Sequence, residues 1–138
     1  DLETYIGLNR PIKSELWESL LRTIEMTRNL RCPTVMRITA IRDINMDLNS
    51  AEGFAKLVEL GEFTYIEVKG YMHLGYSIYR LNRASMPSLG EVEIFSSKLA
   101  NMTGYKILDR CPESNVVLLS RLEKTIRFSN PSKGHPQQ

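Results

Sequence analysis

Two short β-branched segments, separated by a helical stretch, constrain the fold of this chain more than any other feature. VMRITAI, residues 35–41, and FTYIEVK, residues 63–69, alternate between two faces and predict strands. Between them, Phe54, Leu57 and Val58 recur at helical spacing. A strand, a helix and a strand in this order predict two parallel strands joined by a crossover. Because two parallel strands are few for an independent sheet, we expect this chain to form part of a larger sheet or barrel.

Capping patterns mark where the helices begin and end. Ser, Thr, Asp and Asn favour the residue before a helix, and Gly favours the residue after it. The expected caps are Ser14 for a helix over residues 14–29, Asn49 with Glu52 for the helix that Gly61 ends, and Ser88 with Glu91 for the helix that Gly104 closes.

The pattern of residues in the last third of the chain predicts a β-hairpin followed by a polar tail. Residues 105–109 (YKILD) and 116–120 (VVLLS) look like two strands, and the RCPESN between them fits a hairpin loop. The final SNPSKGHPQQ is polar and contains Pro and Gly. We therefore expect one folded unit over residues 1–122 and a mostly disordered tail over residues 123–138.

Length and composition exclude several classes of protein. The 138 residues suit one domain, and a net charge of +2 does not by itself argue for nucleic-acid binding. No apolar run approaches the roughly 20 residues that a membrane span needs, so we expect no membrane partner. Cys32 and Cys111 lie far apart and outside any CxxC pattern, which predicts reduced thiols, a cytoplasmic location and no metal site. The start at Asp1 suggests a fragment or a processed chain.

Charged residues lie on both predicted parallel strands, where apolar runs are usual. Arg37 and Thr39 share one face of the first strand, and Glu67 and Lys69 share one face of the second. If both faces point the same way, these side chains form a polar cluster that suits the carboxylate and ammonium groups of an amino acid. Alternatively, Arg37 and Glu67 form a structural ion pair and Lys69 is simply solvated.

The connection that follows Lys69 contains cations and aromatics but no acidic residue from Val68 through Gly90. This pattern suits phosphate contact and base stacking. An ordinary solvated loop, with its tyrosines packed on the core, is the alternative. A lone histidine is not a set of metal ligands. The residues concerned are Lys69, Tyr71, His73, Tyr76, Tyr79, Arg80 and Arg83.

Four segments together carry a family resemblance. FTYIEVKGYMHLGYSIYRL with the following ASMPS closely resembles FIEVKxYMHVGYSxxRL…NMP of the tRNA 4-demethylwyosine synthases, which are radical S-adenosylmethionine enzymes. ETYIGLNRP, VMRITAIRDINM and YKILDRCPESNVVLLS are similar to flanking stretches of the same family, in the same order. The likeness covers nearly all of residues 2–121. Ile78 departs from it, because the family often has Arg or Lys there.

The resemblance implies an α/β fold that forms the C-terminal part of a partial (β/α) barrel and ends in a β-hairpin. It also implies an enzyme that uses S-adenosylmethionine, 4Fe-4S clusters and pyruvate. That enzyme adds a two-carbon unit to N1-methylguanosine next to the anticodon of phenylalanine tRNA. The CxxxCxxC motif for the cluster is absent from this sequence. We therefore expect these residues to be inactive without the N-terminal half of the barrel.

The resemblance also suggests which side chains bind which ligand, although it assigns no catalytic residue and no metal ligand to this sequence. A different radical enzyme that shares the barrel, and a stand-alone, non-catalytic tRNA-binding α/β module, are the alternative functions. Candidates for the cofactor are Arg37, Thr39, Glu67, Lys69, Tyr71, Met72 and His73, and candidates for RNA are Tyr76, Tyr79, Arg80 and Arg83.

Overall fold

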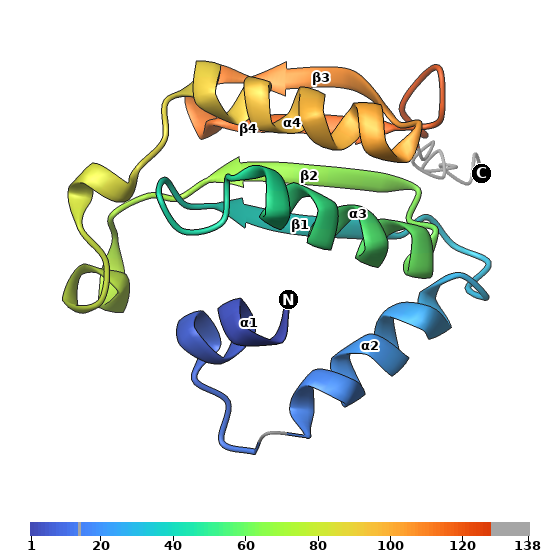
Figure 1. Ribbon diagram of the computed structural model, residues 1–138. Coiled ribbons are helices and arrows are strands. Elements are labelled where there is room, and N and C mark those ends of the chain that lie inside the picture. The colour runs from blue at the N-terminus through green and yellow to red at the C-terminus, as the bar shows by residue number, and fades with distance from the viewer. Residues whose placement is uncertain (14, 128–138) are drawn as a thin grey trace, which may run out of the picture.

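The computed structural model describes residues 1–13 and 15–127 and contains a four-stranded sheet covered by helices on one face (Figure 1). Short 3₁₀ turns occupy Gly75–Tyr79, Arg83–Ser85 and Pro112–Ser114. The helices are α1 (Leu2–Asn9), α2 (Leu16–Thr27), α3 (Leu48–Gly61) and α4 (Leu89–Thr103), and the strands are β1 (Val35–Ala40), β2 (Tyr65–Gly70), β3 (Lys106–Cys111) and β4 (Val116–Ser120).

The sheet is mixed, with the strand order β1-β2-β4-β3. β1 and β2 are parallel, which confirms the prediction from the strand–helix–strand order. β3 and β4 form the expected hairpin, and β4 pairs with β2 in the antiparallel direction. β2 is therefore a central strand, and β1 has no second neighbouring strand among the described residues.

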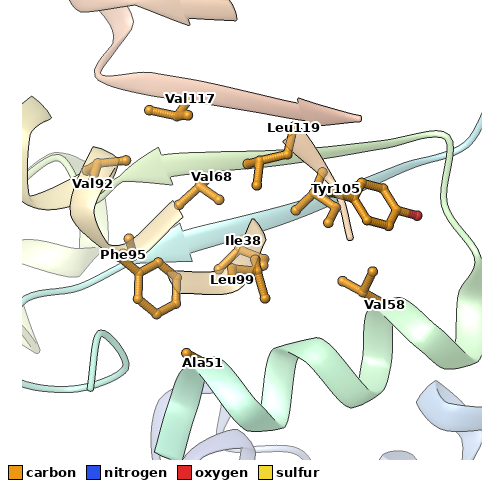
Figure 2. Packing of buried hydrophobic residues seen from close by; sticks show 12 residues of the cluster. Ile38, Ala51, Val58, Val68, Val92, Phe95, Leu99, Tyr105, Val117 and Leu119 are labelled. Atoms are coloured by element: carbon orange, nitrogen blue, oxygen red, sulfur yellow. The ribbon is translucent and has the colours of Figure 1, made fainter. Parts of the chain in front are cut away.

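The hydrophobic core lies between the sheet and the pair α3 and α4, which lie side by side over the same face (Figure 1). Along each strand the side chains point alternately to the two faces of the sheet, so every second side chain enters this core. Figure 2 shows the contributions of the strands and helices converging in one layer. The buried residues of the core include Ile38, Val68, Val117 and Leu119 from the sheet, and Ala51, Val58, Val92, Phe95 and Leu99 from the helices.

The caps agree with the sequence at α4 and differ at α3. Ser88 and Glu91 form a full capping box, and Gly104 closes α4 in the left-handed conformation with φ 72°. At α3, however, Asp47 is the N-cap instead of Asn49, because its extended backbone lets its carboxylate accept a hydrogen bond from the Ser50 amide at 2.7 Å. Asn49 already lies inside the helix. The left-handed C-cap of α3 is Glu62. Ser14 lies outside the described residues, and the N-cap of α2 is Glu15, so the expected cap Ser14 was wrong.

The first helix was not expected from the sequence. α1 begins at the N-cap Asp1, whose carboxylate accepts a hydrogen bond from the Thr4 amide at 2.9 Å. It buries no residue, so no apolar periodicity marks it. α2 confirms the predicted helix and packs on α3, where Thr27 donates to the Gly61 carbonyl at 3.0 Å.

Several strand and helix boundaries shift by one or two residues relative to the sequence prediction. β2 begins at Tyr65 and extends to Gly70, and β3 extends to Cys111. After β4, the Ile126 amide donates to the Tyr65 hydroxyl at 2.7 Å, so the first part of the predicted tail returns to the sheet. The remainder of that tail, residues 128–138, lies outside the described residues. No helix in the described ranges is long and apolar enough to cross a membrane.

Candidate functional site

The face of the sheet opposite the core carries the polar residues that the sequence singled out. Arg37 and Thr39 are exposed on β1, and Glu67 and Lys69 are half-buried on β2. The parallel register places Arg37 beside Glu67 and Thr39 beside Lys69. The four candidates therefore share one face, which the sequence pattern had left open.

Arg37 and Glu67 form a two-pronged ion pair. The Arg37 Nη2 lies 3.0 Å from both carboxylate oxygens of Glu67, and its Nε lies 3.2 Å from Oε2. The Glu67 side chain is 21% exposed and that of Arg37 is 61% exposed. The structural ion pair between Arg37 and Glu67, one of the two alternatives drawn from the sequence, is therefore present. Lys69 has no ion pair within the described residues, so it supplies the uncompensated positive charge of this face.

The same face becomes apolar where it continues onto β4. Leu118 is the partner of Glu67 across the antiparallel ladder, and Val116 is the partner of Lys69. Both aliphatic side chains are half-buried. The open face therefore joins a charged half to an apolar half, which suits a ligand with one charged end and one apolar end.

Tyr71 fixes the start of the long connection after β2. Its ring is 6% exposed, and its backbone amide donates to the Ala40 carbonyl at 2.8 Å. Its hydroxyl lies 3.0 Å from His73 Nδ1 and 3.0 Å from Ser77 Oγ. Tyr71 therefore holds the loop, while Met72 next to it is 44% exposed.

The RNA-binding candidates divide into two groups. Tyr76 and Tyr79 are 87% and 79% exposed, so neither packs on the core. A surface hollow of about 440 Å³ brings Tyr79, Arg80 and Arg83 together with His73. Tyr76 does not line it, and Asn82, which does, was not singled out from the sequence. Arg80 also donates to the carbonyl of Leu8 and so ties α1 to this loop.

Arg42 anchors the far end of the same connection and was missed by sequence analysis. Its guanidinium binds Glu91, with Nε to Oε1 at 2.8 Å and Nη2 to Oε2 at 2.5 Å, and also donates to the Ala84 carbonyl at 2.7 Å. The hydrogen bond from Arg42, with others from Ser88, lowers the pKa of Glu91 to about 2. A lone arginine after a strand gives no sequence signal for this contact, since its partner lies 49 residues away.

The described residues supply no metal centre. No group of three or more His, Cys, Asp or Glu side chains in the described ranges is arranged to hold a metal ion. Cys32 and Cys111 are exposed free thiols. The residues described here therefore do not fit an iron–sulfur cluster, which usually takes four cysteine thiolates.

Comparison with known proteins identifies the family. Residues 60–121 match the family model for wyosine base formation. The chain is 38% identical to the S-adenosyl-L-methionine-dependent tRNA 4-demethylwyosine synthase of Pyrococcus horikoshii over 88% of this chain, and 34% identical to that of Methanocaldococcus jannaschii over 83%. The chain belongs to the tRNA 4-demethylwyosine synthase family. It spans about a third of these relatives, 35% of each.

Solved structures of the family share this fold. The structure of TYW1 with a lysine-pyruvate adduct bound matches with a TM-score of 0.74 and 31% identity, over 88% of this chain and 37% of the other. Archaeal TYW1 matches with a TM-score of 0.69 and 28% identity, over 91% of this chain and 38% of the other. The mixed α/β sheet described above is therefore the arrangement found in part of these synthases.

Proposed function

We propose that this chain is the C-terminal part of an S-adenosylmethionine-dependent tRNA 4-demethylwyosine synthase and forms part of its (β/α) barrel. The observation that carries the proposal is the open polar face of β1 and β2, next to a connection without carboxylates. In such a barrel this face points inward, and the active site lies at the carboxyl ends of the strands. Lys69 and the connection after β2 lie at that end.

The open face fits the amino-acid end of S-adenosylmethionine. Within residues 1–13 and 15–127 the Lys69 ammonium has no ion-pair partner, so it can bind a carboxylate. Thr39 beside it offers a hydroxyl, and the Arg37–Glu67 pair links the two strands. The exposed Met72 extends this surface beyond β2. When bound, S-adenosylmethionine would supply radical chemistry at the methyl group of N1-methylguanosine, with the electron coming from a cluster that the described residues do not hold. Pyruvate supplies the two-carbon unit, and we assign no residue of this chain to it.

The connection after β2 provides the RNA contacts in this proposal. Tyr76 and Tyr79 expose their rings to stack on unpaired bases, and Arg83 offers a cation to the backbone phosphates. The proposed RNA is the anticodon region of phenylalanine tRNA, modified in the cytoplasm. Arg80 contributes less directly because it already donates to α1.

An activity assay on the full native chain tests the proposal. The protein, purified without oxygen, is incubated with tRNA containing N1-methylguanosine, pyruvate, S-adenosylmethionine and a reductant, and the nucleosides are analysed by mass spectrometry. We expect 4-demethylwyosine. Titration calorimetry should show weaker S-adenosylmethionine binding for Lys69→Met but not for Lys98→Met, a control on α4. Fully loaded enzyme that makes no tricyclic base would refute the activity.

A stand-alone, non-catalytic tRNA-binding module is the second candidate. The carboxylate-free connection favours it, because that connection offers RNA contacts without any metal. The gene sequence upstream of the Asp1 codon separates the two candidates. An in-frame extension with CxxxCxxC supports the radical enzyme. A start codon near Asp1, with salt-dependent tRNA binding in the absence of metal, supports the binding module.

A further inference from the structure

A directional hydrogen-bond chain in the connection after β2 determines which ring nitrogen of His73 carries its proton. Ser77 Oγ donates to the Leu74 carbonyl at 2.6 Å, and a carbonyl can only accept, so the single proton of Ser77 is used there. The Tyr71 hydroxyl, 3.0 Å from Ser77 Oγ, must then donate to it. The proton of Tyr71 is thereby used as well.

It follows that His73 donates to Tyr71. The Tyr71 oxygen lies 3.0 Å from Nδ1 of His73, and with its own proton engaged it can only accept there. Neutral His73 therefore has its proton on Nδ1 and presents a lone pair on Nε2. Two further contacts fix the residue, because its amide donates to Met86 Sδ at 3.2 Å and its ring meets Tyr71 edge to face.

Nε2 of His73 is available to a ligand. No hydrogen bond to it occurs within residues 1–13 and 15–127. The buried side-chain polar atoms that lack a partner in those ranges are Ser96 Oγ and Asn115 Oδ1, so Nε2 is reached by solvent. An acceptor in this position binds a donor such as a hydroxyl, whereas a phosphate oxygen offers no proton.

Donors for a phosphate line the same hollow. Arg83 has no ion pair in the described part of the chain. Asn82 uses its Oδ1 to accept from the Ala84 amide at 3.2 Å, and its side-chain NH₂, which donates to no other described residue, can donate to a ligand. The hollow, at about 440 Å³, is shallow and widely open to solvent, so it can receive only one face of a ligand. It thus combines one fixed acceptor with a cation and an amide donor.

We propose that this hollow binds one ribose of an RNA strand together with its 3′ phosphate. The ribose 2′-hydroxyl donates to Nε2 of His73, and the phosphate is bound by Arg83 and Asn82. These two groups are neighbours on every ribonucleotide, and the 2′-hydroxyl is the group that distinguishes RNA from DNA. The proposal rests on the proposed function in taking RNA as the substrate, and it assigns selectivity for RNA to His73.

The charges of the hollow favour RNA over the ribose of S-adenosylmethionine. That cofactor has a 2′-hydroxyl but no phosphate, and it carries a positive sulfonium that Arg83 repels. His73 also lies with the RNA candidates Tyr79 and Arg83 in the hollow, while the cofactor candidates Thr39 and Lys69 lie on the sheet. We therefore assign His73 to the RNA side of the site.

Binding of the anticodon stem-loop of phenylalanine tRNA to the full native chain tests this assignment. Fluorescence anisotropy compares the RNA with versions that carry a 2′-deoxy sugar at one loop position at a time. We expect one position at which the 2′-deoxy sugar weakens binding about fivefold, the effect of one hydrogen bond. His73→Ala should weaken binding of the all-ribose RNA by a similar factor and should make that position insensitive to the 2′-deoxy change.

Further variants separate the hydroxyl contact from the phosphate contact. His73→Gln retains an acceptor and should keep part of the 2′-deoxy effect. Tyr71→Phe removes the hydroxyl that keeps the proton of His73 on Nδ1. It should therefore reduce the 2′-deoxy effect without changing the salt dependence. Arg83→Gln should weaken RNA and DNA alike and reduce the slope of log K against log salt by about one. Arg31 is an exposed arginine before β1. Arg31→Gln is therefore the matched control, and it should change neither the affinity nor the salt dependence.

Two results would overturn the inference while leaving RNA binding intact. One is equal affinity for the stem-loop and all its 2′-deoxy versions. The other is a 2′-deoxy effect that persists in His73→Ala, because the hydroxyl would then be recognised elsewhere. Failure of the full native chain to bind the stem-loop at all would instead contradict the RNA half of the proposed function, and the inference with it.

Discussion

Arg42 joins three separate parts of the chain at the carboxyl end of β1. Its backbone amide donates to the Ser85 carbonyl at 2.9 Å, and its side chain reaches Ala84 and Glu91. The connection that carries the RNA candidates is therefore held at one end by Tyr71 and at the other by Arg42. Glu91 has two roles, because its carboxylate accepts a hydrogen bond from Arg42 and also completes the capping box of α4.

The Arg42–Glu91 contact predicts a pH dependence of stability. The pKa of folded Glu91 is about 2, below its ordinary value of 4.5, so between these values the folded state binds fewer protons than the unfolded state. Stability from this contact is present above about pH 4.5 and is lost as the pH falls toward 2. Urea unfolding at pH 6, 4, 3 and 2 should show a steeper acid loss for the wild type than for Glu91→Gln.

The matched control for this titration is Glu59→Gln on α3, an exposed carboxylate without a hydrogen bond in the described part of the chain. It should reproduce the wild-type pH profile. Equal acid slopes for the wild type and Glu91→Gln would show that the contact contributes nothing to folding.

Gly70 is required at the end of β2 because the side chain of Asn115 lies close to the backbone there. A Cβ there would lie 2.2 Å from Nδ2 of Asn115, which donates to the Pro87 carbonyl at 2.8 Å. Gly70→Ala should lower the free energy of unfolding by about 2–4 kcal/mol, the cost of overpacking together with a lost hydrogen bond. Urea denaturation measures this, and Gly90→Ala in α4, where the nearest atom is 3.9 Å away and Ala favours the helix, should be neutral or slightly stabilising. A Gly70→Ala variant as stable as Gly90→Ala would contradict the geometry.

At the scale of the elements, α4 connects the core to the site. Its apolar face enters the core through Val92, Phe95 and Leu99, and its first turn carries Glu91 and the N-cap Ser88. The position of this first turn therefore determines where Arg42 finds its partner. Because α4 follows the connection directly, its cap also determines where the connection ends.

Ser88→Ala should destabilise the fold by about 1 kcal/mol, since the Glu91 amide loses the hydroxyl that caps it at 3.3 Å. Ser88→Thr keeps a hydroxyl and should lose much less. Thermal unfolding followed by circular dichroism measures both variants. If the two variants melt alike, the hydroxyl of Ser88 is not the source of the stability.

At the scale of the whole molecule, the described residues leave most of one sheet face and the edge of β1 uncovered (Figure 1). Val35 on that edge is 54% exposed. An edge strand with unpaired backbone groups is a template for pairing with another strand. In the proposed barrel, the preceding part of the synthase would cover both surfaces.

We therefore expect residues 1–138, expressed alone, to associate with further copies of themselves through the β1 edge. Light scattering should give an apparent mass that rises with concentration. Val35→Lys should reduce this association because a charge on an edge strand opposes pairing. Ile94→Lys, on the exposed side of α4, should leave it unchanged. A monomer at high concentration would show that the open edge does not pair.

The sequence by itself determined the elements and the faces. Alternation placed Arg37 with Thr39 on one face of β1 and Glu67 with Lys69 on one face of β2, because side chains of a strand point alternately to its two faces. The parallel register then decided that these two faces coincide. Capping chemistry placed the start of α4 at Ser88, because that signal is contained in four consecutive residues. The α3 cap was assigned wrongly for a related reason. Both Asp47 and Asn49 are good caps, and only the backbone conformation chooses between them.

Only the tertiary structure decided which distant groups meet. The antiparallel insertion of β4 beside β2, the reach of Arg42 to Glu91, and the meeting of His73 with Arg83 all depend on how the chain packs. The tautomer of His73 depends on the positions of the Ser77 and Tyr71 hydroxyls, which local sequence does not determine. The physical reason is that periodicity and caps act within a few residues, whereas a site is assembled by packing across the whole chain.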